Sequence, residues 1–243
     1  MGLATADDLR LANRNAAALW TALAEARGHP LTRRPGFLAV HGSGRTGLRI
    51  LLLDPAPTED DLAELTELVH QGRAGRLTVE DPYGRLDLAP LGLTSRSLPV
   101  MIRRPVPVPD PALPVTAVER PDQLAVAEDV VVHGFPLPDL QPRHPGEAFP
   151  ADLLDRPEAR FFVVHSDGVP AGACLTVSDA RTVGLYWMTT LPQHRSRGVG
   201  RALLHGALNH RADLPMTLTA ARAGRPLYDS LGFVPVADAR WWG

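Results

Sequence analysis

The sequence contains no lysine, and all 25 basic residues in its 243 are arginine. Without lysine, the chain has no amine to bind phosphate as the P-loop lysine does, and none to form a Schiff base with pyridoxal phosphate. Both of these enzyme classes are therefore excluded before any motif is considered.

The chain has a single cysteine, Cys174, which excludes an internal disulfide and is typical of a reducing cytoplasm. No apolar run approaches the roughly 20 residues of a membrane-spanning helix, and the first residues show no signal-peptide pattern. The net charge of −2 gives no overall basic field for nucleic acid or membrane. We therefore expect a cytoplasmic protein with neither kind of partner.

A hydrophobic content of 44% and a charged content of 21% are ordinary for a globular protein, and the length suits one large or two small domains. The clearest boundary is a run of alternating prolines between Arg103 and Pro114. Such a run favours a stiff, extended segment and cannot form a central strand. We predict domains at residues 1–104 and 115–243, joined by a linker at residues 105–114.

Helical and strand-like patterns alternate in both halves. Before the linker, capping-box patterns at Thr5 and Thr58 predict two helices. The predicted strands there cover residues 37–40, 48–53, 77–79 and 100–102. After the linker, we predict helices over 121–134, 199–211 and 226–231, and strands over 115–118, 161–165, 171–177, 183–190, 216–220 and 233–236. Mixed elements of this kind indicate an α+β fold.

Residues 42–47, Gly-Ser-Gly-Arg-Thr-Gly, match the G-x-G-x-x-G pattern of dinucleotide-binding loops. That motif must open a helix, whereas the following residues 48–53 form a buried-strand pattern. We interpret the glycines as a hairpin turn.

The stretch Leu191-Pro-Gln-His-Arg-Ser-Arg-Gly-Val-Gly-Arg201 lies between a predicted strand and a predicted helix. Glycines allow close approach of the backbone, and the first N–H groups of a helix have no partner within it. Two glycines and three arginines at such a junction predict a phosphate-binding site. The alternative is an ordinary surface turn with solvated arginines.

Two motifs give the chain a recognisable resemblance. Residues 195–200, Arg-Ser-Arg-Gly-Val-Gly, match the R-x-x-G-x-G acyl-CoA signature of the GNAT superfamily of N-acetyltransferases. Residues 227–233, Leu-Tyr-Asp-Ser-Leu-Gly-Phe, resemble the L-Y-x-x-L-G-F motif that closes the same fold. The resemblance covers roughly residues 117–243 and implies a mixed, mostly antiparallel sheet flanked by helices.

The first half resembles a degenerate copy of the same unit, which would give a tandem arrangement. Residues 87–93, Asp-Leu-Ala-Pro-Leu-Gly-Leu, align with residues 227–233, and the helices beginning near Thr58 and Gly198 then coincide. Residues 55–60 offer carboxylates where the second half has glycines and arginines. Because carboxylates repel a diphosphate, we expect no CoA site in the first half.

The resemblance implies direct transfer of an acetyl group from acetyl-CoA to an amine. It assigns cofactor binding to the end of the strand before the motif and to the motif itself. These residues are Met188, Thr189, Thr190, Arg195, Ser196, Arg197, Gly198, Val199, Gly200 and Arg201. The main chain of the first three would polarise the thioester carbonyl, which is where such a site gains most.

By the same resemblance, the phenol of Tyr228 would protonate the departing CoA thiolate, a role suited to a group that is protonated at neutral pH. Its alternative role is a buried aromatic on a helix face. No carboxylate lies on the strand over residues 183–190, where many relatives carry a glutamate base. Asp179, His165, His133 and a water relay are open alternatives, and no base is assigned.

Two substitutions depart from the family pattern. Ser196 stands where glycine is frequent, and Ala221 replaces an asparagine that often contacts pantetheine. A small residue such as Ser196 should be tolerated, but Ala221 and the missing glutamate favour an alternative function, a non-catalytic acyl-CoA-binding sensor or scaffold. No cluster of metal-ligating residues is present, so no metal is expected. The sequence does not identify the amine acceptor, which is either a small molecule or a protein. A homodimer is a possible assembly.

Overall fold

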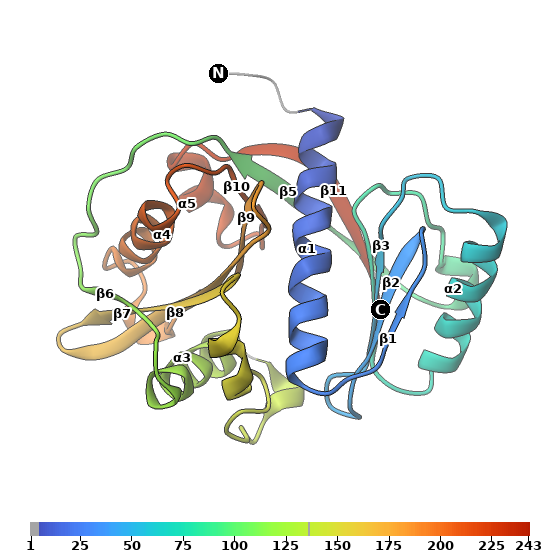
Figure 1. The fold of residues 1–243 in the computed structure, drawn as a ribbon, viewed down its shortest axis with the longest axis horizontal. Helices are drawn as coiled ribbons and strands as arrows, with labels where there is room; N and C mark the ends of the chain where they lie inside the picture. Colours follow the sequence, from blue (N-terminus) through green and yellow to red (C-terminus); the bar gives the residue numbers. More distant parts are fainter. Residues whose placement is uncertain (1–4, 136) are drawn as a thin grey trace. The chain divides into compact units, whose positions relative to one another are not determined.

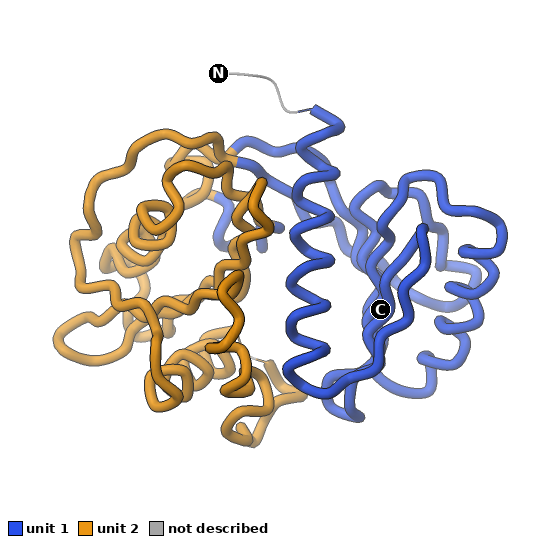
Figure 2. Tube along the Cα trace, in the orientation of Figure 1, with its two compact units in different colours: residues 1–102, 219–225, 234–243 blue, residues 103–218, 226–233 orange. Residues whose placement is uncertain are grey.

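The computed structural model describes residues 5–135 and 137–243, which divide into two compact units (Figure 2). Unit 1 contains the chain up to Ile102, Thr219–Arg225 and Val234–Gly243. Unit 2 contains Arg103–Leu218 and Pro226–Phe233. The chain therefore returns to unit 1 at its end, whereas the sequence-based division assigns all of residues 115–243 to one domain.

Unit 1 combines two long helices with a six-stranded sheet (Figure 1). Its elements are α1 (Ala6–Ala26), β1 (Leu31–Arg33), β2 (Phe37–His41), β3 (Leu48–Leu52), α2 (Glu59–Gly72), β4 (Leu77–Asp81), the 3-10 turn η1 (Ala89–Leu91), β5 (Ser95–Arg103) and β11 (Val234–Trp242). The strand order is β1-β2-β3-β4-β11-β5. Residues 42–47 form the turn of the antiparallel β2–β3 hairpin, which confirms that the glycine motif is a turn.

Both helices of unit 1 begin with the predicted capping boxes. The Thr5 side chain accepts from the Asp8 N–H at 3.3 Å, and the Asp8 carboxylate accepts from the Thr5 N–H at 2.9 Å. Thr58 and Asp61 make the same reciprocal pair at 3.1 and 3.4 Å. At the start of α2, the N–H groups of Thr58 and Asp61 are therefore each bonded by the side chain of the other residue.

The two helices of unit 1 cover opposite faces of the sheet. Alternate residues of β3 separate them, because successive strand side chains point to opposite faces. Ile50 packs in the cluster that includes Leu65 and Val69 of α2. Leu51 packs in the cluster that includes Ala17 of α1. Each face is therefore closed by one amphipathic helix.

Strand β11 lies between β4 and β5 and is antiparallel to both. It pairs with β5 from Val234 to Trp242, with a register shift between Pro235 and Ala237. The sequence predicts only residues 233–236 as strand. The longer strand depends on partners more than 130 residues away in sequence, which a local pattern does not reveal.

Unit 2 carries a five-stranded sheet in the order β10-β9-β8-β7-β6 (Figure 1). Its elements are β6 (Val115–Ala117), α3 (Pro121–Gly134), the 3-10 turns η2 (Pro138–Leu140) and η3 (Ala151–Asp155), β7 (Ala159–Ser166), β8 (Val169–Ser178), β9 (Val183–Thr190), the 3-10 turn η4 (Pro192–His194), α4 (Val199–His210), β10 (Met216–Thr219) and α5 (Arg225–Ser230). Residues 104–114 contain neither helix nor strand, as expected for the proline-rich segment.

The two units share a β–α–β crossing. In unit 1, α2 connects β3 to its parallel neighbour β4, and in unit 2, α4 connects β9 to its parallel neighbour β10. The other pairings described within each sheet are antiparallel. In each unit, mixed strand pairing flanked by helices confirms the predicted α+β class.

The turn after each crossing also has the same hydrogen bonds in both units. In unit 1 the N–H groups of Leu91, Gly92 and Leu93 donate to Leu88, Ala89 and Leu88. In unit 2 those of Leu231, Gly232 and Phe233 donate to Tyr228, Asp229 and Tyr228. Gly92 and Gly232 both have a left-handed backbone, with φ of 80° and 84°. This match places Leu88 at the position that corresponds to Tyr228.

Candidate functional site

Helix α4 begins without any side-chain cap. Gly198 is its N-cap residue, has φ of 79°, and leaves the first turn without a carboxylate. The N–H of Ala202 makes the first α-helical hydrogen bond, to the Gly198 carbonyl at 2.9 Å. The preceding N–H groups of Val199, Gly200 and Arg201 have no α-helical acceptor. An anion placed at this end would meet open donors and the positive end of the helix dipole.

The two glycines of this motif have different surroundings. A Cβ atom on Gly198 would meet no atom within 4 Å, so the space in front of the helix is free. A Cβ atom on Gly200 would lie 3.2 Å from Leu227, 3.5 Å from the Thr190 hydroxyl and 3.8 Å from the Met188 methyl. The structure therefore brings Met188, Thr190 and Gly200 together beside α5. The helix start at Gly198 is therefore open, whereas Gly200 is packed against its neighbours.

The three arginines of the motif make only exposed interactions. Arg195 Nε donates to the Thr190 carbonyl at 3.3 Å, and Arg201 Nη2 donates to Ser230 Oγ at 3.0 Å. Arg197 lies 3.9 Å from Asp167 in an exposed ion pair. Exposed pairs of this kind contribute about 0–1 kcal/mol, so a phosphate could replace them.

Ser196 adopts a left-handed backbone, with φ of 60°. Glycine adopts this conformation without cost, whereas an L residue is strained by about 1–2 kcal/mol. This explains why glycine suits the position. In this chain the strained residue, Ser196, lies in the loop that would surround the phosphates.

Strand β9 contains a β-bulge next to the motif. Its pairing with β8 changes register between Ala173–Thr189 and Leu175–Tyr186, so that Trp187 and Met188 together face Cys174. Trp187 has φ of 46°, another left-handed L residue. A bulge interrupts the regular strand ladder and changes the direction of the groups next to it. The strand end after the bulge is where the resemblance places the acyl carbonyl of the ligand.

Successive residues after the bulge point to opposite faces of the sheet. A Cβ atom on Gly134 of α3 would lie 2.6 Å from the Thr189 hydroxyl, so the Thr189 side chain packs under α3. Met188 and Thr190 face Gly200 of α4 instead. Only the main chain of Thr189 can therefore serve the predicted site. Helices α3 and α4 accordingly cover opposite faces of this sheet.

Tyr228 is the buried residue of α5, with 8% of its surface exposed, and its ring packs edge-on against Phe233 at 5.7 Å. Burial raises the pKa of its phenol to about 12, and the neighbouring Cys174 adds to the shift. Among the described residues, its hydroxyl makes no hydrogen bond. The phenol therefore stays protonated and available as a donor.

Cys174 is fully buried opposite the bulge, and burial raises the pKa of its thiol. A protonated, buried thiol is a poor nucleophile. It packs as a small apolar side chain.

Two of the three candidate bases have structural partners, and the third lies at a strand irregularity. Asp179 Oδ1 accepts hydrogen bonds from the Arg181 N–H and from the N–H and hydroxyl of Thr182, which closes the β8–β9 turn. His133 Nδ1 lies 2.9 Å from the carbonyl of Asp129 one turn earlier in α3. His165 lies in β7, next to a register shift in its pairing with β8. None of these contacts links a candidate to Tyr228 or the bulge.

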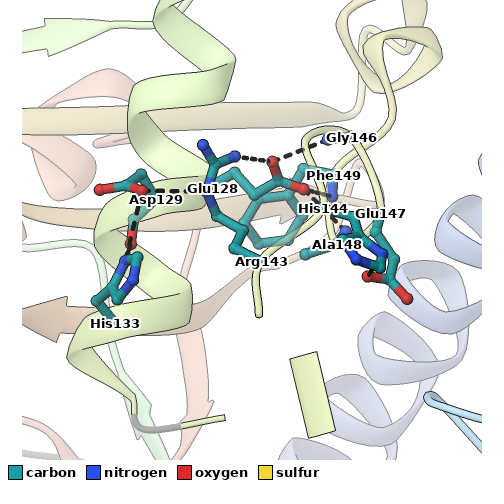
Figure 3. Close-up of polar contacts among 9 residues, drawn as sticks. All are labelled: Glu128, Asp129, His133, Arg143, His144, Gly146, Glu147, Ala148 and Phe149. Carbon is teal, nitrogen blue, oxygen red and sulfur yellow. Dashed lines mark hydrogen bonds and ion pairs between the residues drawn. The ribbon is translucent and has the colours of Figure 1, made fainter. Parts of the chain in front are cut away.

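A polar cluster on α3 escapes the sequence analysis (Figure 3). Its centre is Glu128, which is buried and accepts hydrogen bonds from Arg143 and from the backbone of residues 146–149. A signal for it exists in the sequence. Glu128 follows Ala127 and lies one turn after Leu124 and one turn before Val131, on the apolar face of the helix. A carboxylate there requires buried partners.

Within residues 5–135 and 137–243, no three His, Cys, Asp or Glu side chains come together as metal ligands. No helix in the same part of the chain is long and apolar enough to cross a membrane.

Comparison with protein families matches residues 157–235 to the acetyltransferase (GNAT) domain. This region contains the β9 bulge, the motif at the start of α4, and Tyr228. It confirms the family that the two sequence motifs indicate. No curated protein matches the chain.

Solved structures resemble nearly the whole chain at low identity. A GCN5-related N-acetyltransferase from Kribbella flavida is 17% identical with a TM-score of 0.68, covering 96% of this chain and 95% of its own. An acetyltransferase of the GNAT family from Novosphingobium aromaticivorans is 17% identical with a TM-score of 0.60, covering 95% of each. A tandem GNAT protein of the clavulanic acid biosynthesis pathway is 17% identical with a TM-score of 0.57, covering 99% and 96%. At these identities the likeness establishes the fold.

Proposed function

Because residues 157–235 belong to the GNAT acetyltransferase domain family, we propose that this acyltransferase moves an acetyl group from acetyl-CoA to an amine. The observation that carries the proposal is the uncapped start of α4. Its free N–H donors, its lack of first-turn carboxylates and the open space at Gly198 fit a diphosphate. Arg195, Arg197 and Arg201 would add charge at this end.

Bound acetyl-CoA would supply the reactive thioester. The bulge at Trp187–Met188, followed by Thr189 and Thr190, would bind the acyl carbonyl through main-chain groups. Hydrogen bonds aimed at a developing oxyanion are the largest contribution that such a site can make. Met188 and Thr190 lie against Gly200, so this strand end would be beside the proposed phosphate site.

In the proposed reaction, the amine nitrogen forms a bond to the acyl carbon and the carbon–sulfur bond breaks. The Tyr228 hydroxyl gives its proton to the departing sulfur. The proton that leaves the amine goes to water, since the structure assigns no base. The raised pKa of Tyr228 keeps the donor protonated throughout the neutral range.

We also infer that unit 1 is a degenerate GNAT-like unit, so that the protein has a tandem arrangement. The shared β–α–β crossing and the matching turn at Gly92 and Gly232 support this inference. The predicted domain division, cytoplasmic location and homodimer stay predictions from the sequence.

The second candidate function is a non-catalytic acyl-CoA-binding sensor or scaffold. One observation favours it: the three candidate bases hold turns or helices or lie at a strand irregularity, and within the described residues none is hydrogen-bonded to the Tyr228 hydroxyl. Such a protein would bind acetyl-CoA without transferring its acetyl group.

Binding and turnover separate the two functions. Acetyl-CoA is titrated by calorimetry, and thiol release is then followed across a panel of small amines and peptides, with the wild type and Tyr228→Phe. We expect both proteins to bind equally, because the substitution removes only a hydroxyl. Loss of the general acid should lower kcat by about 10²- to 10⁴-fold.

The outcomes are distinct. Binding without thiol release across the panel would favour the sensor. Turnover that is unchanged in Tyr228→Phe would remove the acid role from that residue. If acetyl-CoA does not bind to the wild type, both functions are wrong.

A further inference from the structure

The carboxylate of Glu128 is saturated with hydrogen bonds, two on each oxygen (Figure 3). Oε2 accepts from Arg143 Nη1 at 2.8 Å and from the Gly146 N–H at 2.9 Å. Oε1 accepts from the N–H groups of Ala148 at 2.8 Å and Phe149 at 3.1 Å. A carboxylate has about four acceptor sites, so none is left for a substrate. Glu128 is an anchor for this segment.

The segment that Glu128 holds ends in a buried aromatic residue. The ring of Phe149 lies 4.8 Å from that of Phe161 in β7, and 5.4 Å edge-on from that of Trp187 in β9. Both spacings fall in the range of favourable aromatic pairs. A hydrogen bond to the backbone of Phe149 therefore determines what its ring presses against.

Trp187 is the left-handed residue of the β9 bulge. L residues keep this conformation only where the surrounding structure fixes it. Phe149 is one of the neighbours that hold the Trp187 ring, and Met188 follows directly in the chain. The position of the bulge is thus connected through two packed rings to a single buried carboxylate.

We propose that Glu128 is a positioning residue for acyl transfer. By anchoring residues 143–149, it sets Phe149 against Trp187 and so fixes the main-chain groups of the bulge that face the acyl carbonyl. This inference rests on the proposed function, which supplies the acyl group. It goes beyond that function because Glu128 touches neither cofactor nor substrate.

Glu128 and the uncapped start of α4 should therefore control the binding of different parts of the ligand. The start of α4 would bind the diphosphate, which CoA and acetyl-CoA share. The bulge contacts the acetyl group, which only acetyl-CoA carries. Because only acetyl-CoA makes the contact with the bulge, the wild type should bind it more tightly than CoA. Disturbing Glu128 should remove this preference and leave CoA binding intact. A purely structural role would lower both affinities together.

The chain offers a matched control on the next residue of the same helix. Asp129 also contacts Arg143, at 3.0 Å from Nε, but its side chain is 52% exposed, whereas that of Glu128 is 1% exposed. Glu128→Gln and Asp129→Asn remove the same charge. Only the first places an amide NH₂ group against two buried N–H donors, which breaks one side of the anchor.

The experiment measures the dissociation constants of CoA and acetyl-CoA by calorimetry, and kcat with an amine that the wild type acetylates. In Glu128→Gln we expect CoA affinity within about threefold of wild type, loss of the acetyl-CoA preference, and a kcat lower by about 10- to 100-fold, as displaced oxyanion donors produce. Asp129→Asn should keep the wild-type preference and kcat.

A second variant covers the case in which Glu128→Gln does not fold. Phe149→Leu stays apolar but loses the ring contact with Trp187, and it should show the same loss of preference. If either folded variant keeps the wild-type preference, or loses CoA and acetyl-CoA affinity equally, the positioning role is wrong. A wild type that binds neither ligand would overturn the proposed function as well.

Discussion

Helices α2 and α4 occupy the same place in the two units, but their first turns are chemically opposite. Helix α2 is capped by Thr58 and carries Glu59, Asp60 and Asp61 in its first turn. Helix α4 starts at an uncapped glycine with no acidic residue. The first arrangement satisfies the helix and repels anions, whereas the second leaves the helix unsatisfied and attracts them. One fold thus gives either a stable helix start or a ligand site.

The strands before these helices also differ: the strand in unit 1 is regular and the strand in unit 2 is interrupted. Strand β3 pairs with β2 in unbroken register from Leu48 to Leu52. Strand β9 is interrupted by the bulge at Trp187. The turns at Gly92 and Gly232 show the same contrast. Leu88 packs in the core of unit 1 at the position where unit 2 has Tyr228. Unit 1 has regular structure at three positions where unit 2 has strained or unsatisfied groups, as expected at functional sites.

Unit 1 nevertheless contains the strands that pair with β11 near the end of the chain. Removing unit 1 should therefore have the largest effect on folding and on acetyl-CoA binding. We expect residues 105–243 alone neither to fold cooperatively nor to bind acetyl-CoA. Strand β11 would lose both of its neighbours, β4 and β5. The segment that carries Tyr228 also lies, in sequence, between two segments of unit 1. Circular dichroism melting and calorimetry measure the loss, and co-expression of residues 1–104 should restore both properties. Full binding by the isolated fragment would show that the C-terminal part is autonomous.

Giving α4 the acidity of α2 should have the next largest effect. Gly198→Glu should weaken acetyl-CoA binding by at least about 100-fold, since one or two hydrogen bonds to a charged group contribute about 1.5–3 kcal/mol each. Gly198→Ala is the control, because both variants carry the left-handed strain of about 1–2 kcal/mol. Calorimetry and thermal melting separate affinity from stability. Equal affinities in the two variants would show that charge does not distinguish the two helix starts.

A pH profile of kcat/KM tests whether Tyr228, unlike the corresponding Leu88, acts as a proton donor. The pKa of Tyr228 is raised to about 12, so its phenol loses the proton only near that pH and donates at every lower value. We expect log kcat/KM to rise with a slope of about one up to the amine pKa near 10, with no basic limb below it. Steady-state rates from pH 6 to 10 test this. A basic limb that Tyr228→Phe abolishes would mean that the phenol ionises much earlier.

How far the sequence predicts this molecule depends on the distance between interacting residues. The capping boxes at Thr5 and Thr58, the β2–β3 turn and the start of α4 depend on neighbours within a few residues, and all were predictable. The partners of β11 and the bulge at Trp187 were not, because they are set by strands distant in sequence. Glu128 left a visible trace as a carboxylate on an apolar face, but its partners in residues 143–149 have no regular pattern.

The smallest expected effect lies in the capped helix. Thr58→Ala removes the side chain that accepts from the Asp61 N–H and should lower the free energy of unfolding by about 1 kcal/mol, within the usual 0.5–2 kcal/mol for a cap. Acetyl-CoA affinity should not change, because we expect no ligand at this acidic helix start. Urea unfolding and calorimetry measure the two quantities. A change in affinity with stability intact would assign the first turn of α2 a part in binding, and the two helix starts would then differ in degree and not in kind.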